Sequence, residues 1–255
     1  MTSLIVGASS GLGRALAQEL AGRGHELLLV SSDARDLDAI AADLRLRHDV
    51  TVHVLALDLA HEADPGARLA SALDTMPALD ALLLPVGLSR SDDDFSLDAA
   101  RIGQLLAINL HAPLAIVQAL LPRLLASRGV IVLFGSIAAV RGRGRNVVYA
   151  AAKRALESLH ESLRQRHPPQ HLRVQLYRLG FLATNLTHGV ALPAPATEPA
   201  LVARIVAARL TRGSARWYLP RRFGLIALLV RWMPWGLGTY SSVGLYAGHS
   251  LRRVQ

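Results

Sequence analysis

The chain has 255 residues, of which 51% are hydrophobic and 18% are charged, and it contains no cysteine. A chain of this length and composition can bury a large core, which predicts one α/β domain and excludes a disordered protein. Without cysteine, disulfide scaffolds, thiolate zinc sites and cysteine nucleophiles are excluded. The formal net charge of +9 first suggests nucleic acid or an anionic surface as the partner.

The basic excess is confined to the end of the chain. Glu198 is the last acidic residue, and residues 199–255 contain nine arginines. The whole chain has 28 basic and 19 acidic residues, so residues 1–198 contain 28 − 9 = 19 basic residues against 19 acidic ones and are neutral. Only one of the 28 basic residues is a lysine, Lys153, so its position needs an explanation.

Apolar runs alternate with amphipathic stretches along the chain. The predicted strands are Leu4–Val6, Glu26–Ser31, Thr51–Leu57, Ala81–Pro85, Val130–Gly135, Arg173–Arg178 and Arg216–Leu219. The predicted helices are Arg14–Arg23, Asp36–Arg47, Gly66–Thr75, Ser96–Ala126 and Val147–Arg166. Short, continuously apolar strands separated by helices predict a doubly wound parallel sheet of about seven strands with helices on both faces. The start of the chain lacks a basic region, so we expect no signal peptide and a cytoplasmic protein.

A glycine-rich turn, Gly7-Ala8-Ser9-Ser10-Gly11-Leu12-Gly13, joins the first predicted strand to the first helix. Such a turn lets backbone amides approach a pyrophosphate at the positive N-terminus of a helix. The spacing Gly-x3-Gly-x-Gly differs from the commonest dinucleotide fingerprint, and an ordinary tight turn is the alternative. Its place after the first strand of an alternating chain favours phosphate binding, with candidate contacts Gly7, Ser9, Ser10, Gly11 and Leu12.

Tyr149 and the sole lysine, Lys153, are four residues apart on one predicted helix. Residues at i and i+4 share a helix face, so the phenol and the ammonium can meet in one site. A free phenol has a pKa of about 10, and a nearby cation would lower this pKa toward the range useful for proton transfer. A chance pair on a solvated face is the alternative, but arginine fills the 27 other basic positions, which counts against chance.

Two further polar residues occupy positions that suggest a function. Ser136 follows the predicted strand Val130–Gly135, and the carboxyl ends of parallel strands face the ligand crevice. Its hydroxyl could hold a carbonyl oxygen, whereas a turn serine is the alternative. Asn109 is in the middle of the predicted helix Ser96–Ala126, where asparagine is unfavourable. It is either an exposed helix residue or one whose side chain makes a local bond at a kink, or its carbonyl or amide holds a water near Lys153.

Together these residues resemble the short-chain dehydrogenase/reductase family over about residues 3–220, in the family's order. Asn109, Ser136, Tyr149 and Lys153 match its catalytic tetrad. The resemblance implies a Rossmann-like fold, a homo-oligomer, and hydride transfer between a nicotinamide and a carbonyl carbon. It also implies that Tyr149 donates the proton, Lys153 lowers the phenol pKa and binds the nicotinamide ribose, Ser136 orients the carbonyl, and Asn109 holds a water.

Other segments match the family pattern, and two depart from it. The pair Asp58-Leu59 matches the adenine contact, and Gly180-Phe181-Leu182-Ala183-Thr184 matches the segment that closes over the nicotinamide, with Thr184 as a contact. The family's Asn-Asn-Ala-Gly is Leu84-Pro85-Val86-Gly87 here, so only Gly87 remains beside the ribose. The family's Pro-Gly is Leu179-Gly180. The loss of the two asparagines puts the hydrogen bonds of their side chains in doubt, but not necessarily the binding of the cofactor.

The choice of cofactor depends on the end of the second predicted strand. An acidic side chain there would bind the adenosine 2′-hydroxyl and repel a 2′-phosphate. Here Ser31 and Ser32 occupy the critical positions, and Asp33 follows them. Serines can donate to a 2′-phosphate, which Arg14 or Arg35 could also reach, so we expect NADP. If Asp33 rather than Ser32 faces the ribose, NAD is expected instead.

A loop with three arginines, Arg141-Gly142-Arg143-Gly144-Arg145, lies between Ser136 and Tyr149. In this family the loop borders the substrate mouth, so these arginines could bind a phosphate or carboxylate of the substrate; a solvated basic loop is the alternative. The run Asp92-Asp93-Asp94 is expected to be a solvated loop rather than a metal site. The histidines show no metal-ligand spacing, and we expect no metal.

We divide the chain into a catalytic domain, residues 1–220, and a C-terminal helical extension, residues 221–255. All three tryptophans lie beyond residue 199, and residues 223–230 form an uncharged run closed by Arg231. No stretch of this extension has the about 20 apolar residues of a spanning helix. Apolar residues, tryptophans and flanking arginines instead favour peripheral association with the cytoplasmic face of a membrane. A pocket lid or an oligomer contact is the alternative, and nothing else supports nucleic-acid binding.

The arginine loop and the extension resemble, more loosely, the keto-pentose reductase subgroup that works with the decaprenylphosphoryl-ribose epimerase. This resemblance implies a lipid-linked or otherwise lipidic carbonyl substrate. A reductase of 3-oxoacyl chains on a carrier protein is the nearest alternative, since arginines also suit an acidic carrier. A cofactor-binding regulator or scaffold without turnover is an alternative from a different class, against which the full tetrad argues.

Overall fold

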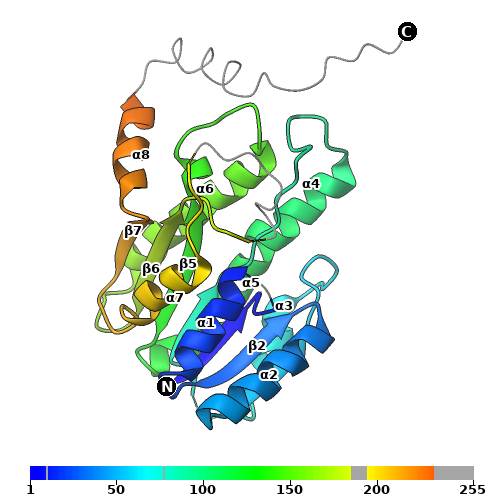
Figure 1. Cartoon of the computed structure of the whole chain (residues 1–255), viewed down its shortest axis with the longest axis vertical. Coiled ribbons are helices and arrows are strands. Elements are labelled where there is room, and N and C mark those ends of the chain that lie inside the picture. The colour runs from blue at the N-terminus through cyan, green and yellow to red at the C-terminus, as the bar shows by residue number, and fades with distance from the viewer. Residues whose placement is uncertain (10, 77, 185–193, 233–255) are drawn as a thin grey trace.

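The computed structural model describes residues 1–9, 11–76, 78–184 and 194–232. Within these ranges, seven strands form one parallel sheet in the order β3-β2-β1-β4-β5-β6-β7 (Figure 1), which confirms the expected fold class. The strands are β1 (Thr2–Val6), β2 (Glu26–Ser31), β3 (Val52–Ala56), β4 (Ala81–Leu84), β5 (Val130–Ser136), β6 (Arg173–Leu179) and β7 (Ala215–Leu219). The order of connection reverses between β1 and β4, and in open sheets such a switch point opens a ligand crevice at the carboxyl ends of the strands.

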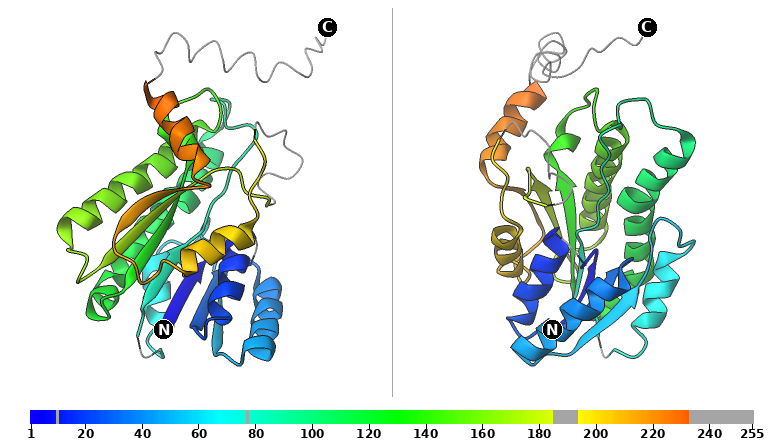
Figure 2. Two further views of the ribbon diagram at one scale, coloured as in Figure 1. Left: turned by 60° about the vertical axis from the view of Figure 1, so that its left-hand side comes forward. Right: turned by 45° about the vertical axis from the view of Figure 1, so that its right-hand side comes forward.

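Helices cover both faces of the sheet, as the two views of Figure 2 show. One layer consists of α1 (Gly11–Ala21), α2 (Ala34–His48) and α7 (Pro199–Ala207). The other consists of α3 (Pro65–Ala72), α4 (Ala99–Leu106), α5 (Ala112–Ala126) and α6 (Val147–Arg166). A last helix, α8 (Arg222–Trp232), follows β7 at the edge of the molecule. Ser10 and residues 233–255, to which the sequence assigns a cofactor contact and most of the extension, lie outside the described residues.

The five inner strands are buried on both faces because their side chains alternate between two cores, whereas the outer strands β3 and β7 are partly exposed. In β1, Ile5 packs in the core under α1, α2 and α7, whereas Leu4 and Val6 pack in the core under α3 and α5. Leu4 is in register with Leu28 of β2 and Leu82 of β4. This double burial is why the strands are continuously apolar rather than alternating.

The helices differ from the predicted ones in three ways. The first begins at Gly11 rather than Arg14, so the glycine turn itself forms its first turn. The predicted helix Ser96–Ala126 begins at Ala99 and contains a π-helical segment, η1 (Ala107–His111). Pro113 supplies a reason, because it has no N–H to donate to the carbonyl four residues earlier. The sequence patterns did not predict α7, which packs against α1.

Among the described residues, the continuous helix Ala99–Ala126 is the one that is long and apolar enough to cross a membrane. Its inner side is built into the core, where Ile116, Leu120 and Leu124 are fully buried beneath the sheet. Core helices of soluble domains pass the same length and hydropathy test, so this helix gives only weak support for a membrane span.

Candidate active site

The glycine turn after β1 is packed so closely that side chains would not fit. Gly7 has a φ of +92°, which favours glycine, and its N–H donates to the carbonyl of Val30 at 2.7 Å. A Cβ on Gly13 would lie 1.9 Å from the carbonyl oxygen of Gly7, and a Cβ on Gly11 would lie 3.0 Å from Cγ2 of Thr184. The turn thus brings bare backbone to the N-terminus of α1 and to Thr184. This cradle fits the pyrophosphate of a dinucleotide, as the sequence predicts.

The side chains around the turn differ in where they point: a serine bonds to the end of β2, whereas a leucine is buried in the core. The Ser9 and Ser31 hydroxyls form a hydrogen bond of 2.7 Å, which links the turn to the end of β2. Leu12, in contrast, points into the core, so only its backbone can serve the predicted cofactor contact. Ser32 is exposed beside this pair. Asp33 caps α2, because its carboxylate accepts a hydrogen bond from the N–H of Asp36 at 2.9 Å.

Asp58 lies just beyond the end of β3, on the side of the sheet that is formed by the carboxyl ends of the strands. Its carboxylate accepts hydrogen bonds from Nδ1 of His61 at 2.8 Å and from the N–H of Ala60 at 2.9 Å. These two bonds, the one from His61 first, lower the pKa of Asp58. Leu59 is half-buried against the core. Both residues are therefore placed at the crevice where the sequence expects the adenine contact.

Ser136 and Tyr149 meet at the carboxyl end of β5. Ser136 is the last residue of β5, and its hydroxyl accepts a hydrogen bond from the N–H of Ala138 at 3.1 Å. Its side chain also lies close enough to the phenol of Tyr149 to act on the pKa of that phenol. Burial raises the pKa of that phenol, while the neighbouring Ser136 side chain and the charge of Arg143 act in the opposite direction. The expectation that Lys153 brings this pKa below its ordinary value is thus not met in the structure, because desolvation dominates.

Lys153 is almost completely buried, with 3% of its surface exposed. Its Nζ lies 5.8 Å from the centroid of the Tyr149 ring and donates to the carbonyl of Val86 at 2.9 Å. Burial lowers the pKa of Lys153 from 10.5 to about 8. Gly87 lies beside it, since a Cβ on Gly87 would be 3.7 Å from Nζ. The backbone of the altered loop after β4 therefore holds the lysine without the family's asparagines.

Asn109 is fully buried in η1 and also binds this loop. Its Nδ2 donates to the carbonyls of Leu88 at 2.8 Å and Leu105 at 2.9 Å, and its Oδ1 accepts from the N–H of Leu88 at 3.1 Å. Both amide hydrogens are therefore used within the protein. Pro113 removes the usual helical donor to the main-chain carbonyl of Asn109, which makes that carbonyl the better candidate for holding a water.

Asp93, the middle residue of the acidic run after β4, is buried, which corrects the expectation of a solvated loop at this position, whereas Asp94 is exposed as expected. Asp93 has 1% of its surface exposed, and its carboxylate accepts hydrogen bonds from the N–H groups of Val148 and Tyr149, both at 2.9 Å. It therefore caps the helix that carries Tyr149 and Lys153. The sequence contained no signal for this contact, because Val148 and Tyr149 are 55 and 56 positions away from Asp93 in the chain. The described residues contain no cluster of metal ligands.

A buried ion pair fixes α6 to the sheet one turn beyond Lys153. Glu157 accepts two hydrogen bonds from the guanidinium of Arg178 on β6, one of them with Nε at 2.6 Å. Arg178 also donates to the hydroxyl of Tyr218 on β7. Each of the two charged side chains is less than a tenth exposed. The pair is a second anchor, in addition to Asp93, for the helix that carries the two catalytic candidates.

The arginine loop borders a cavity of about 590 Å³. Its basic lining residues are Arg141, Arg143, Arg154 and Arg231, and the rest are mostly small and apolar: Ala138, Ala139, Val140, Gly142, Val147, Ala150 and Ala151. Arg145, the third predicted substrate contact, does not line it. One wall of the cavity is the face of α6 that lies next to the face carrying Tyr149 and Lys153. Arg143 connects the two, because its charge also acts on the phenol of Tyr149.

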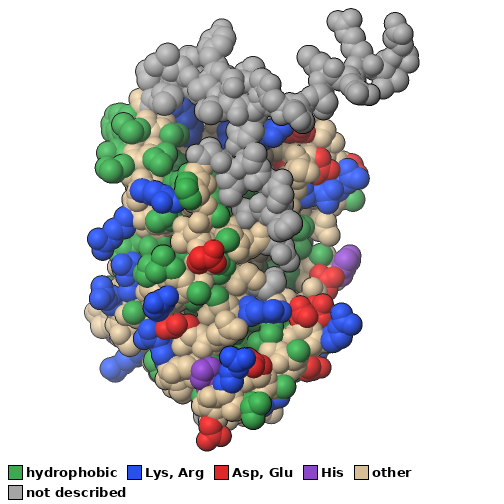
Figure 3. Space-filling view, in the orientation of Figure 1, with side chains coloured by type: hydrophobic (Ala, Val, Ile, Leu, Met, Phe, Trp, Pro, Cys, Tyr) green, Lys and Arg blue, Asp and Glu red, His purple; other side chains and the backbone are tan. Residues whose placement is uncertain are grey.

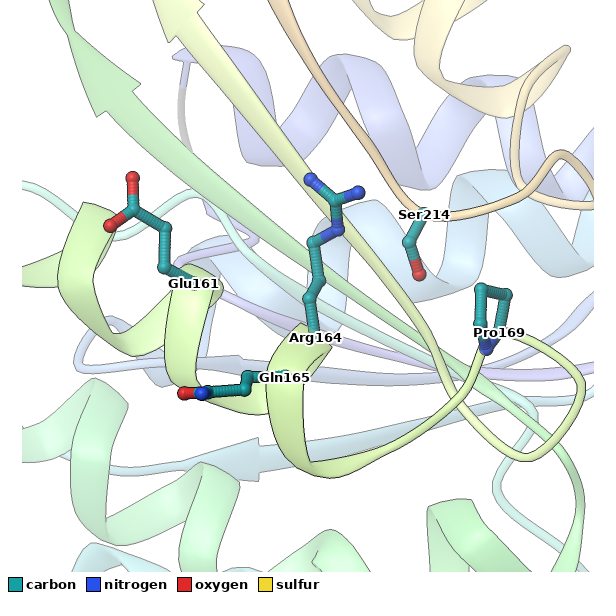
Figure 4. Close-up of a pocket in the computed structure, with 5 residues that line it drawn as sticks. All are labelled: Glu161, Arg164, Gln165, Pro169 and Ser214. Atoms are coloured by element: carbon teal, nitrogen blue, oxygen red, sulfur yellow. The ribbon is translucent and has the colours of Figure 1, made fainter.

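Another cavity, of about 350 Å³, lies near the C-terminal end of α6 and is lined by Glu161, Arg164, Gln165, Pro169 and Ser214 (Figure 4). Arg164 is fifteen residues beyond Tyr149, which corresponds to about 22 Å along a helix. This cavity is therefore remote from the candidate tetrad.

Known proteins share the sequence and the fold. The model of the short chain dehydrogenase family matches residues 2–193. YmfI, an uncharacterized oxidoreductase of Bacillus subtilis, is 29% identical over 213 residues, which cover 83% of this chain and 86% of YmfI. The hydroxysteroid 11-beta-dehydrogenase 1-like protein of Macaca fascicularis is 29% identical over 239 residues, 91% of this chain and 82% of the relative.

A solved structure agrees over the full length. The short-chain dehydrogenase from Sphingobium yanoikuyae in complex with NADPH is 27% identical, with a TM-score of 0.80, and the match covers 100% of this chain and 98% of that chain. The family model covers most of the sequence, and the sheet order and glycine cradle agree with it. The chain therefore belongs to the short-chain dehydrogenase/reductase family and is an NAD(P)-dependent oxidoreductase.

Proposed function

We propose that the chain is an NADPH-dependent reductase that acts on a carbonyl group of a lipidic or lipid-linked substrate. The reaction class is supported by one observation, which is that Ser136, Tyr149 and Lys153 are grouped near the carboxyl end of β5. The side chain of Ser136 acts on the pKa of the Tyr149 phenol, and the buried ammonium of Lys153 lies 5.8 Å from the centroid of the Tyr149 ring.

The charges of this group suit reduction. Because burial raises the pKa of Tyr149, the phenol keeps its proton at neutral pH and can donate it to a carbonyl oxygen as negative charge develops there. The Ser136 hydroxyl can hold the same oxygen. Lys153, with a pKa of about 8, is mostly protonated at pH 7 and can stabilise the phenolate that remains. Bound NADPH would supply the hydride to the carbonyl carbon.

The residues that would hold the cofactor are the glycine cradle, Lys153 and the end of β2. The preference for NADPH is supported by Asp33, because its carboxylate caps α2 and is engaged with the N–H of Asp36. Arg35 is exposed on the same helix and would attract a 2′-phosphate. Fluorescence titration tests this preference. We expect tighter binding of NADPH than of NADH; equal or reversed affinities would contradict it.

The proposed substrate class is supported by the cavity beside Arg143. Its apolar lining and four arginines suit a molecule that combines a hydrocarbon part with a phosphate. A 3-oxoacyl chain on a carrier protein is the competing substrate. A panel that contains keto-sugars on lipid phosphates, steroid ketones and 3-oxoacyl carriers, followed by the loss of NADPH absorbance, distinguishes these classes.

The reaction is tested with Tyr149→Phe, which removes only the phenol hydroxyl. We expect turnover to fall by at least about a thousandfold, within the range for a general acid, while NADPH binding stays within a few-fold. The matched control is Tyr218→Phe, which removes a hydroxyl that bonds Arg178 on β6 and should keep turnover. Near-normal activity of Tyr149→Phe would refute the proposal.

A further inference from the structure

The helix α8 leaves an apolar face in contact with solvent. Leu225, Ile226, Leu228, Leu229 and Trp232 are between 44% and 79% exposed. The residues Phe223 and Ala227, one turn apart, are buried. A helix on a globular surface normally shows the reverse on its outer side, where polar residues predominate. In Figure 3, hydrophobic side chains accordingly gather over this helix.

The helix is anchored to the catalytic body, so this face is held in place. The ring of Phe223 lies 2.1 Å from the position that a Cβ on Gly180 would occupy, so only glycine allows the contact. Phe223 also packs edge-on against Phe181, with ring centroids 6.0 Å apart. Arg222 donates to the carbonyl of Pro195 at 2.8 Å. The anchor is therefore the same segment that the family resemblance places over the nicotinamide.

Basic residues flank the apolar face. Arg221 and Arg222 are exposed at its start, and Arg231 is exposed in its last turn. The chain contains no acidic residue after Glu198, so no nearby carboxylate of the same segment compensates these charges. A second copy docking face to face would bring these arginines against one another, which disfavours a symmetric dimer here.

We propose that α8 docks on an anionic lipid surface, with its leucine-rich face between the headgroups and its arginines against the lipid phosphates. An exposed apolar helix face with flanking basic residues can lie in the plane of the interface, and each basic residue adds attraction to anionic lipid. Amphipathic arginine side chains can reach the phosphates while their stems stay near the apolar layer.

Docking would also orient the cavity. Arg141 donates to the carbonyl of Val230 at 2.9 Å, and Arg231 lines the cavity of the arginine loop. The C-terminal end of α8 therefore forms part of that cavity's wall. A helix lying in the interface would place the cavity next to the headgroup layer, where a lipid-linked substrate carries its phosphate. This last step rests on the proposed function, whereas membrane docking itself does not.

The experiment is co-sedimentation of the full chain with phosphatidylcholine vesicles that contain phosphatidylglycerol, and with phosphatidylcholine vesicles alone. We expect binding to the anionic vesicles that weakens in high salt. The double variant Leu225→Glu/Leu229→Glu should lower the partition constant more than tenfold. The matched control, Leu46→Glu/Leu201→Glu, changes two exposed leucines on α2 and α7 and should bind as the wild type does.

Titration with NADPH checks that every variant is folded and separates the two proposals. Loss of vesicle binding with normal cofactor affinity supports docking through α8, whatever the substrate proves to be. Equal binding by the wild type and the α8 variant, or no binding by the wild type, would overturn it. A dimer that is present in the wild type and lost in the α8 variant would also overturn it, because the face would then belong to a second copy.

Discussion

The buried carboxylate of Asp93 offers a sharp test of how the active-site helix is positioned. The first N–H groups of a helix have no partner within it. The residue before α6, Asn146, has a left-handed conformation with φ of 52° and makes no side-chain capping bond. The acceptors for Val148 and Tyr149 are instead the two oxygens of Asp93, each at 2.9 Å.

The cost of removing this carboxylate can be worked from those two bonds. A hydrogen bond to a charged group contributes about 1.5–3 kcal/mol, and a carboxylate near a helix N-terminus contributes about 0.3–1 kcal/mol more. Water can replace part of both, so we expect Asp93→Ala to lower the free energy of unfolding by about 3 kcal/mol. Asp93→Asn keeps one oxygen acceptor but turns an amide toward the second N–H group, so we expect about 1–2 kcal/mol.

Urea unfolding and steady-state kinetics measure the two consequences. In Asp93→Asn we expect kcat to fall more than the KM for NADPH rises, because the misplaced group is Tyr149 rather than the glycine cradle. The control is Asp94→Asn, the neighbouring exposed carboxylate, which bonds only Ser96 at 2.7 Å among the contacts of the described residues. If Asp93→Asn and Asp94→Asn behave alike in both assays, the capping argument is wrong.

Three further predictions follow from buried groups. Gly13→Ala should abolish NADPH binding or folding, measured by fluorescence titration and circular dichroism, since its Cβ would lie 1.9 Å from the carbonyl oxygen of Gly7. Glu157→Gln should cost about 3–5 kcal/mol in urea unfolding, because it leaves the buried guanidinium of Arg178 unpaired; a cost below about 1 kcal/mol would contradict this. Burial lowers the pKa of His160 from 6.5 to about 4, so its contribution to stability is complete above pH 6.5 and is lost as the pH falls toward 4. Between pH 7 and pH 4 the free energy of unfolding in urea should therefore fall by about 3 kcal/mol less in His160→Leu than in the wild type. An equal fall in the two proteins would contradict the assignment.

Local spacing and periodicity were enough to predict the sheet and the pair of Tyr149 and Lys153, whereas the resemblance to a known family was needed to join Ser136 and Asn109 to them as a tetrad. Seven apolar runs separated by helical patterns predict a parallel sheet because only strands buried on both faces are continuously apolar. The glycine turn could be recognised because its glycines are close in sequence. Lys153 could be recognised because it is the single lysine of the chain and stands four residues from Tyr149. The helix α7 and the π-helical segment around Asn109 were missed, since propensity does not report how a helix packs.

Tertiary structure decided the features that depend on contacts between distant segments and on burial. Asp93 became a helix cap, and the carbonyl of Val86 became the partner of Lys153, across 67 positions of sequence. Burial also determined that the pKa of Tyr149 is raised, whereas a nearby cation alone would have lowered it. The sequence by itself located the excess of +9 in an acid-free segment after residue 198. Only the packing of Phe223 on Gly180 decided which side of α8 meets solvent, because a helix pattern shows which residues share a face but not which neighbour covers it.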